Sequence, residues 1–406
     1  MLIFVLILGV LFSGAIFFNP AIGVLGLIGL IYSNIGPLIG VSLFSMLLFY
    51  VLACMIVMKL LIEPEFTKHD IDIYLFGLTL FVLIGFVRAF DKILALEAFL
   101  EYIRSLLLFF CIVNLIKSRK FIEFSFFALI VSASFLALYS IHQFNQSTHV
   151  MRFSGVSRDA NELALLISTS IPLSVSLIKT YKNMLIKLCL FVSIILIIAT
   201  VFMTYSRGGF ISLFFIILSL LFLERKRKIV IVLAVALFIF LLYYFLTHLA
   251  HSKIMLRLLT KDTSFIQRLQ LYKGGISMFL SNPVLGVGLG NFLFWSTTYT
   301  GLITSLIAHN IFIQVAAELG IGGIFFFVAV LVVVLKTNLK SYRLAKEASD
   351  RNYLNMAEGV SIAFMSFTVG NLFLTLHFDQ AYWILIGLSV AFYNLIMDEL
   401  GGQRSE

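Results

Sequence analysis

The sequence predicts an all-α, polytopic integral membrane protein. Of its 406 residues, 61% are hydrophobic and only 12% are charged, a composition that soluble globular chains do not have. The apolar residues form continuous runs of about 17 to 25, the length of a membrane-crossing helix. The run from 229 to 249 is apolar on every face, whereas strands of a membrane barrel alternate apolar with polar residues. We therefore expect one helical membrane domain over residues 1–406.

Eleven apolar runs have the length of a membrane span. They cover residues 37–61, 72–88, 98–117, 120–142, 161–180, 183–204, 208–223, 229–249, 309–335, 355–376 and 380–398. Residues 1–34 are also apolar but contain Asn19-Pro20, so they form one kinked helix or two short ones. The expected total is about 12 transmembrane helices (12 or 13). The first helix is expected to be retained, because the N-terminal segment has neither the basic start nor the small-residue cleavage site of a signal peptide.

Positive charge predicts the orientation, because cytoplasmic loops accumulate lysine and arginine. More than half of the 29 basic residues lie in four clusters, at 117–120, 179–187, 225–228 and 336–351. These clusters mark every second loop as cytoplasmic, together with the C-terminus. The loops expected to face outward are 143–160, 205–207, 250–308 and 377–379. The net charge of +9 mostly reflects this topology and gives no support to a nucleic-acid partner.

The large outward loop, 250–308, is expected to contain short amphipathic helices on the bilayer surface. Ile254–Leu259 and Phe265–Leu280 have helical amphipathic spacing, and Asn282-Pro283 ends the second of them. The glycines that follow, from Gly286 to Gly290, are expected to let the backbone turn tightly against the membrane surface. The loop is also basic, which predicts either an outward anion or contact with lipid phosphates.

His309 and Asn310 open the apolar span 309–335, and Gln314 and Glu318 extend a polar stripe along it. Polar groups within a membrane span indicate function. A histidine at the membrane surface is suited to act as a general base near neutral pH, although a structural hydrogen-bonding role is the common alternative. Glu318 is expected to orient or pair with a neighbour rather than to titrate.

Two arginines accompany His309 on the predicted outer face. Arg207 follows Ser206 in a very short turn, at the start of a helix whose free amides, with a guanidinium, form an anion site suited to phosphate. Arg268 shares a helix face with Tyr272, four residues later, and Lys273 adds a positive charge beside them. Membrane anchoring for Arg207 and solvent exposure for Arg268 are the plain alternatives.

A further polar segment ends the loop 143–160. It contains Arg158, Asp159 and Asn161, and it reads as a helix start with Asp159 or Asn161 as the N-cap. Capping and a supporting role in the site are compatible for Asn161. We include Arg158 and Asn161 among the supporting residues.

Four segments, in this order, resemble the superfamily of O-antigen ligases and Wzy-type O-antigen polymerases, which are multi-spanning bacterial membrane enzymes. The segments are GVSRDANELALLI from Gly155, TYSRGGF from Thr204, QRLQLYKGGISMFLSNPVLGVGLGNF from Gln267 and AHNIFIQVAAELGIGG from Ala308. Each is weak alone, but their order and the large loop between the second and the last are fairly specific. The resemblance covers residues 155–325.

The resemblance implies a membrane glycosyltransferase at the outer, periplasmic face of the bacterial inner membrane. Its donor would be a glycan on undecaprenyl pyrophosphate, and its acceptor lipid A-core or a lipid-linked glycan. Arg207 and Arg268 would neutralise the pyrophosphate. His309 would accept the proton of the attacking sugar hydroxyl, and the transfer would invert the anomeric configuration. No cofactor is implied, and no carboxylate pair suggests a metal.

The acceptor distinguishes three enzymes of this kind. A ligase transfers to lipid A-core, a polymerase to a lipid-linked repeat, and an oligosaccharyltransferase to a protein. We favour the ligase because the sequence has one large outward loop, whereas the polymerases often have two. A lipid-linked-sugar flippase remains the alternative of another class. It should carry ionisable groups deep within its spans, and here those groups reduce to Glu101 and Arg104, near Glu97.

Overall fold

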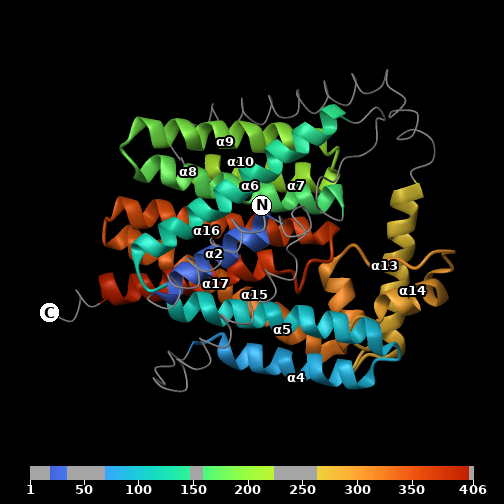
Figure 1. The fold of residues 1–406 in the computed structure, drawn as a ribbon. Helices are drawn as coiled ribbons and strands as arrows, with labels where there is room; N and C mark the ends of the chain where they lie inside the picture. Colours follow the sequence, from blue (N-terminus) through green and yellow to red (C-terminus); the bar gives the residue numbers. More distant parts are fainter. Residues whose placement is uncertain (1–18, 34–68, 147–158, 224–262, 402–406) are drawn as a thin grey trace, which may run out of the picture.

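The computed structural model describes residues 19–33, 69–146, 159–223 and 263–401, and these ranges are helical without any strand (Figure 1). The all-α polytopic class predicted from the sequence is confirmed. The helices are α2 (Pro20–Ser33), α4 (Asp72–Arg88), α5 (Lys92–Leu115), α6 (Arg119–Gln146), α7 (Ala160–Ser168), α8 (Ser170–Thr180), α9 (Met184–Met203), α10 (Arg207–Leu223), α13 (Thr263–Ser281), α14 (Phe292–Thr300), α15 (Ile311–Glu347), α16 (Arg351–Gly370), η1 (Asn371–Phe373), α17 (Gln380–Ile396) and η2 (Met397–Gly401).

Six helical segments of the described residues are long and apolar enough to cross a membrane. They are Arg119–Gln143, Ala160–Thr180, Met184–Met203, Ile311–Glu347, Arg351–Phe373 and Gln380–Leu400. The shorter apolar segments Pro20–Ser33 and Arg207–Phe222 lie among them. Two predicted spans, 37–61 and 229–249, and the outer helix expected at Ile254–Leu259 lie outside the described residues. The total of 12 or 13 spans therefore stays a prediction.

The span expected at 161–180 consists of two helices, α7 and α8, that meet at Thr169. Pro172 explains the break, because proline has no N–H to donate to the carbonyl four residues before it. The Tyr32 hydroxyl of α2 donates to the Leu166 carbonyl at 2.6 Å and also bonds with the Thr169 hydroxyl. These contacts satisfy polar groups at the break inside the bundle.

The span expected at 309–335 also departs from a regular helix. Helix α15 begins at Ile311, and its backbone leaves the helical region at Gly320, where φ is 69°. The segment 283–288 satisfies the backbone groups that the break releases. Ile321 N donates to Pro283 O at 2.8 Å, Val287 N to Ala317 O at 2.8 Å and Gly288 N to Glu318 O at 3.1 Å. The loop after α13 is therefore joined to the break in α15.

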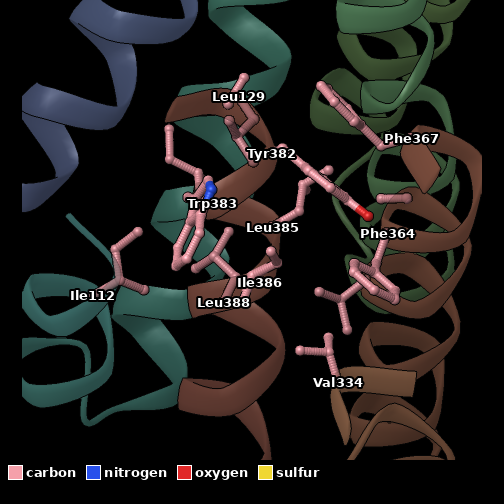
Figure 2. Close-up of a cluster of buried hydrophobic side chains, with 14 of the residues drawn as sticks. Ile112, Leu129, Val334, Phe364, Phe367, Tyr382, Trp383, Leu385, Ile386 and Leu388 are labelled. Carbon is pink, nitrogen blue, oxygen red and sulfur yellow. The ribbon is translucent and has the colours of Figure 1, made fainter. Parts of the chain in front are cut away.

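The interior of the bundle is built around α17, which is buried along almost its whole length. Figure 2 shows Tyr382 and Trp383 of α17 among side chains of α5, α6, α15 and α16. The Tyr382 ring stacks on Phe367 with centroids 4.9 Å apart, and its hydroxyl bonds with Thr368 Oγ1 at 2.8 Å. A helix buried on all sides is apolar all round, which is the pattern that marked 380–398 as a span.

The two ends of the bundle differ in their polar contacts. We use the term outer end for the end at which α4 terminates and α7, α10 and α15 begin (Figure 1). This end carries the described residues of the loops predicted to face outward. The opposite end holds the salt bridges Arg119–Glu123, Lys179–Glu358 and Lys340–Asp70, with N to O distances of 2.9, 3.5 and 3.8 Å. These bridges use basic residues of the clusters predicted to be cytoplasmic.

Helix α13 runs across the outer ends of the other helices (Figure 1). It matches the amphipathic helix expected at 265–280. Leu271 and Met278 face the molecule and are buried, whereas Ile266, Leu269, Ile276 and Leu280 are exposed. Its inner face packs on α14 and α15. Helix α14, which the sequence did not predict, follows the glycine-rich turn.

Candidate functional site

The turn that carries Arg207 is fixed by its neighbours. Tyr205 has a left-handed backbone with φ of 52°. The Ser206 hydroxyl accepts a bond from Gly209 N at 2.9 Å, which satisfies a free amide at the start of α10. The same hydroxyl donates to Asn161 Oδ1 at 2.7 Å. Arg207 is the first residue of α10 and is exposed at the outer end.

The glycines after Arg207 allow close packing. A Cβ added to Gly209 would lie 2.4 Å from Ala164 Cβ of α7, a distance that real Cβ atoms do not show. A Cβ on Gly208 would lie 3.5 Å from Phe373 Cβ, in ordinary contact. The start of α10 is therefore held against α7 on one side and against the turn after α16 on the other.

Asp159 is the N-cap of α7, one of the two residues expected in that role. Its carboxylate accepts from Asn161 N at 3.3 Å and from Asn161 Nδ2 at 2.8 Å. Asn161 is buried, and its amide oxygen accepts the Ser206 bond. The structure thus brings together Asn161 and Ser206, which lie 45 positions apart in the sequence. Arg158 lies outside the described residues.

The second part of the site is formed around His309. Its backbone is left-handed, with φ of 50°, a conformation that costs energy for a residue with a side chain. His309 is partly buried, and its carbonyl accepts a bond from the Tyr272 hydroxyl at 3.3 Å. Asn310 is the N-cap of α15, because its Oδ1 accepts from Phe312 N and Ile313 N, each at 3.0 Å.

Arg268 belongs to this second part through Tyr272, which lies four residues later on α13. Burial raises the pKa of Tyr272, whereas the positive charge of Arg268 and a hydrogen bond with Asn310 lower it. Arg268 therefore lies within electrostatic reach of the hydroxyl that contacts His309. Of the two residues expected to share a helix face, Tyr272 contacts the His309 carbonyl, and Arg268 lies one helical turn before it.

Gln314 and Glu318 extend from His309 into α15. Gln314 Oε1 accepts from Ala308 N at 2.9 Å, and its Nε2 donates to Glu318 Oε1. Glu318 is buried and accepts from Gly290 N at 2.8 Å and from Phe292 N at 3.2 Å. Glu318 thus orients its neighbours and lies apart from the surface at which Arg207 and His309 sit.

The glycine turn packs closely on protein, whereas the sequence suggested that it turns against the membrane surface. Gly286, Gly288 and Gly290 all have positive φ. Cβ atoms added to them would lie 2.3 Å from the Glu318 backbone, 2.5 Å from Ala89 Cα and 2.6 Å from Leu94 O, respectively. Glycine is required because the turn approaches the α15 backbone and the α4–α5 connection too closely for a side chain.

Another supporting residue, Lys273, lies on a different side of α13 from Tyr272. Lys273 is exposed on α13, and it follows Tyr272 by one residue, which rotates it away from the face that meets His309.

The sequence did not reveal the turn Asn371–Phe373 as part of the site. Asn310 Nδ2 donates to Leu372 O at 3.1 Å, and Phe373 packs near Gly208. A backbone carbonyl leaves no signal in a sequence.

The electrostatics of the outer end favour an anion. Three helices that carry site residues, α7, α10 and α15, begin there, and helix N-termini carry partial positive charge. Arg207 and Arg268 add two guanidiniums. Two carboxylates of the described residues are engaged with backbone amides, because Asp159 caps α7 and Glu318 accepts from Gly290 N and Phe292 N, while Glu162 adds one negative charge in the first turn of α7. The arrangement is suited to bind a phosphate-bearing ligand beside an imidazole.

Part of the chain matches a known protein family. Residues 192–328 match the family model described as O-antigen ligase, which confirms the family resemblance indicated by the motifs. The match includes Arg207, Arg268 and His309, whereas the segment from Gly155 precedes it. A search of curated proteins finds no match to the chain.

Proposed function

We propose, for a chain that carries an O-antigen ligase domain at residues 192–328, that it transfers a glycan from undecaprenyl pyrophosphate to lipid A-core. The observation that supports the proposal is that Arg207, Arg268 and His309 belong to elements at the same end of a membrane bundle, where three helices begin. We place this end at the periplasmic face of the inner membrane, as the distribution of basic residues predicts.

The proposed reaction assigns a role to each part of the site. The acceptor hydroxyl attacks the anomeric carbon, and the bond from that carbon to the pyrophosphate oxygen breaks. His309 takes the hydroxyl proton, and the pyrophosphate leaves on its lipid with the bonding electron pair. Attack from the opposite side of the leaving group inverts the anomeric centre. Arg207, Arg268 and the helix N-termini stabilise the charge that develops on the pyrophosphate.

The supporting residues hold this geometry. Asn161 and Ser206 fix the start of α10, and hence Arg207. Tyr272 donates to the His309 carbonyl, and Asn310 caps the helix that follows His309. Groups fixed before the substrate arrives need no reorganisation during the reaction.

The test is a transfer assay in proteoliposomes with an undecaprenyl-pyrophosphate-linked glycan, with lipid A-core supplied or withheld. His309→Asn is the sharpest variant, because asparagine tolerates the left-handed backbone and removes only the imidazole. We expect transfer to fall by about 10²- to 10⁴-fold, the range for loss of a general base. Wild-type transfer in both His309→Asn and Arg207→Ala would rule out the proposed site.

Arg351→Ala is the matched control for Arg207→Ala. Arg351 is also the exposed first residue of a helix, α16, but it lies at the opposite end of the bundle. We expect transfer to persist in Arg351→Ala and to be lost in Arg207→Ala. Glycan lengthening without lipid A-core would identify a polymerase instead. Lipid movement across the bilayer without any glycosidic product would identify a flippase.

A further inference from the structure

The turn Asn371–Phe373 lies at the outer end between α16 and α17, beyond the family-matched residues 192–328. Asn371 is fully buried, and its Oδ1 accepts a bond from Leu376 N at 3.2 Å. Leu374 N also donates to Asn371 O, at 3.4 Å. The turn is thus closed by its own hydrogen bonds and forms a defined element.

This turn contacts both parts of the candidate site. Leu372 O accepts from Asn310 Nδ2 at 3.1 Å, next to His309. Phe373 Cβ lies 3.5 Å from the position of a Cβ on Gly208, next to Arg207. Two adjacent residues of the turn therefore join the residue after the histidine to the residue after the arginine.

We propose that the turn Asn371–Phe373 is a positioning element for the transfer reaction, and that Asn310 is the positioning residue that holds His309 in place relative to Arg207 through it. This inference rests on the proposed function and adds to it a segment from outside the matched domain. Neither Asn310 nor the turn is assigned contact with the reacting atoms.

The side chain of Asn310 makes the role testable, because its two polar atoms do different things. Oδ1 caps α15, and serine or aspartate caps a helix about as well as asparagine. Nδ2 donates to Leu372 O. A serine at the same cap is too short to reach this carbonyl, and an aspartate carboxylate has no proton to donate to it. Asn310→Ser therefore keeps the cap and breaks the bond to the turn.

The experiment compares full-length Asn310→Ser with the unaltered protein in the proteoliposome assay. A misplacement of about 1 Å at a reacting group reduces rate by about a hundredfold, so we expect kcat to fall about ten- to a hundredfold. KM for the lipid-linked glycan should stay close to its original value, because both arginines remain. The melting temperature should also be retained.

Asn183→Ser is the matched control. Asn183 caps α9 in the same way, by accepting from Leu185 N at 2.8 Å and Ile186 N at 3.4 Å, and it lies within the basic cluster 179–187 at the other end of the bundle. We expect its kinetics to be those of the unaltered protein. Gly208→Leu provides a second disturbance of the turn, because a leucine side chain would displace Phe373, and it should also lower kcat.

A cross-link tests the geometry independently of transfer. The Cβ separation at Gly208 and Phe373 is within the range of disulfides, so Gly208→Cys combined with Phe373→Cys should form one in a background without the native cysteines. The pair bridges the contact of the turn with Gly208 and does not replace the bond from Asn310 to Leu372 O, so adding it to Asn310→Ser should leave the loss of kcat in place.

Each outcome decides one proposal. Unaltered kcat in Asn310→Ser, or a loss of kcat matched by an equal loss of folded protein, would overturn the positioning role and leave the proposed function standing. Absence of glycosidic product from the unaltered protein would instead remove the proposed function, and the positioning role with it.

Discussion

Glu318 shows how a conspicuous residue can serve a structural purpose. In the sequence it is an acid within an apolar span, which normally indicates function. In the structure its two oxygens accept from Gly290 N, Phe292 N and Gln314 Nε2. These bonds hold the glycine turn and the backbone before His309. We therefore expect Glu318 to affect transfer only indirectly, by stabilising the local structure before His309.

Replacing Glu318 should destabilise the protein in proportion to the amides left unpaired. Glu318→Ala leaves two buried backbone N–H groups without an acceptor, at about 1 to 3 kcal/mol each. Glu318→Gln retains one carbonyl oxygen and should cost less. Thermal unfolding in detergent should give the lowest melting temperature for Glu318→Ala, an intermediate one for Glu318→Gln and the highest for the unaltered protein. Equal melting temperatures for Glu318→Ala and the unaltered protein would contradict this prediction.

His377, in the connection between η1 and α17, should make stability depend on pH. Burial lowers the pKa of His377 to about 4 from an ordinary value of 6.5. Between these values the unfolded chain binds a proton that the folded protein does not, so stability falls as the pH drops from about 6.5 to 4. His377→Gln should weaken this dependence. Parallel profiles of melting temperature against pH for the two proteins would show that His377 does not cause this pH dependence.

At the scale of elements, the break in α15 depends on Gly320. Its φ is 69°, and an added Cβ would lie 2.3 Å from Val284 O. Gly301 has nearly the same φ, 71°, but nothing within 4 Å of an added Cβ. Gly301→Ala should therefore cost only the backbone strain, about 1 to 2 kcal/mol. Gly320→Ala should cost clearly more, because it also separates α15 from the 283–288 segment.

Thermal unfolding of both alanine variants separates two effects. Gly301→Ala introduces backbone strain alone, whereas Gly320→Ala adds the steric overlap of its Cβ with Val284 O. The expected result is a larger drop in melting temperature for Gly320→Ala. Similar drops would show that the 283–288 segment moves away without cost. Transfer should also fall in Gly320→Ala, since the segment leads through α14 to His309.

At the scale of the whole molecule, the predicted orientation places the two ends of the bundle on opposite sides of the membrane. Ile303, near His309, is almost fully exposed, and Lys346 is exposed at the end of α15. In a background without native cysteines, Ile303→Cys should react with an impermeant maleimide on intact spheroplasts. Lys346→Cys should react only after permeabilisation. The reverse pattern would invert the topology and move the proposed site to the cytoplasm.

The sequence by itself determined the helical membrane class, most described helix positions and the residues that define the candidate site. Hydrophobic length and basic clusters are local properties of the chain, and residues such as Arg207 and His309 stand out against an apolar background. Helix caps were also readable, as Asp159 shows, because a cap needs only its own side chain and the next amides.

Only the tertiary structure decided how these residues meet. Asn161 binds Ser206, and Asn310 binds the Leu372 carbonyl, across 45 and 62 positions of the chain. Such contacts depend on how helices pack, and one partner is often a backbone atom that every residue possesses. The break at Gly320 was hidden for the same reason: its released backbone groups are satisfied by a distant segment, so nothing in the local pattern ends the helix there.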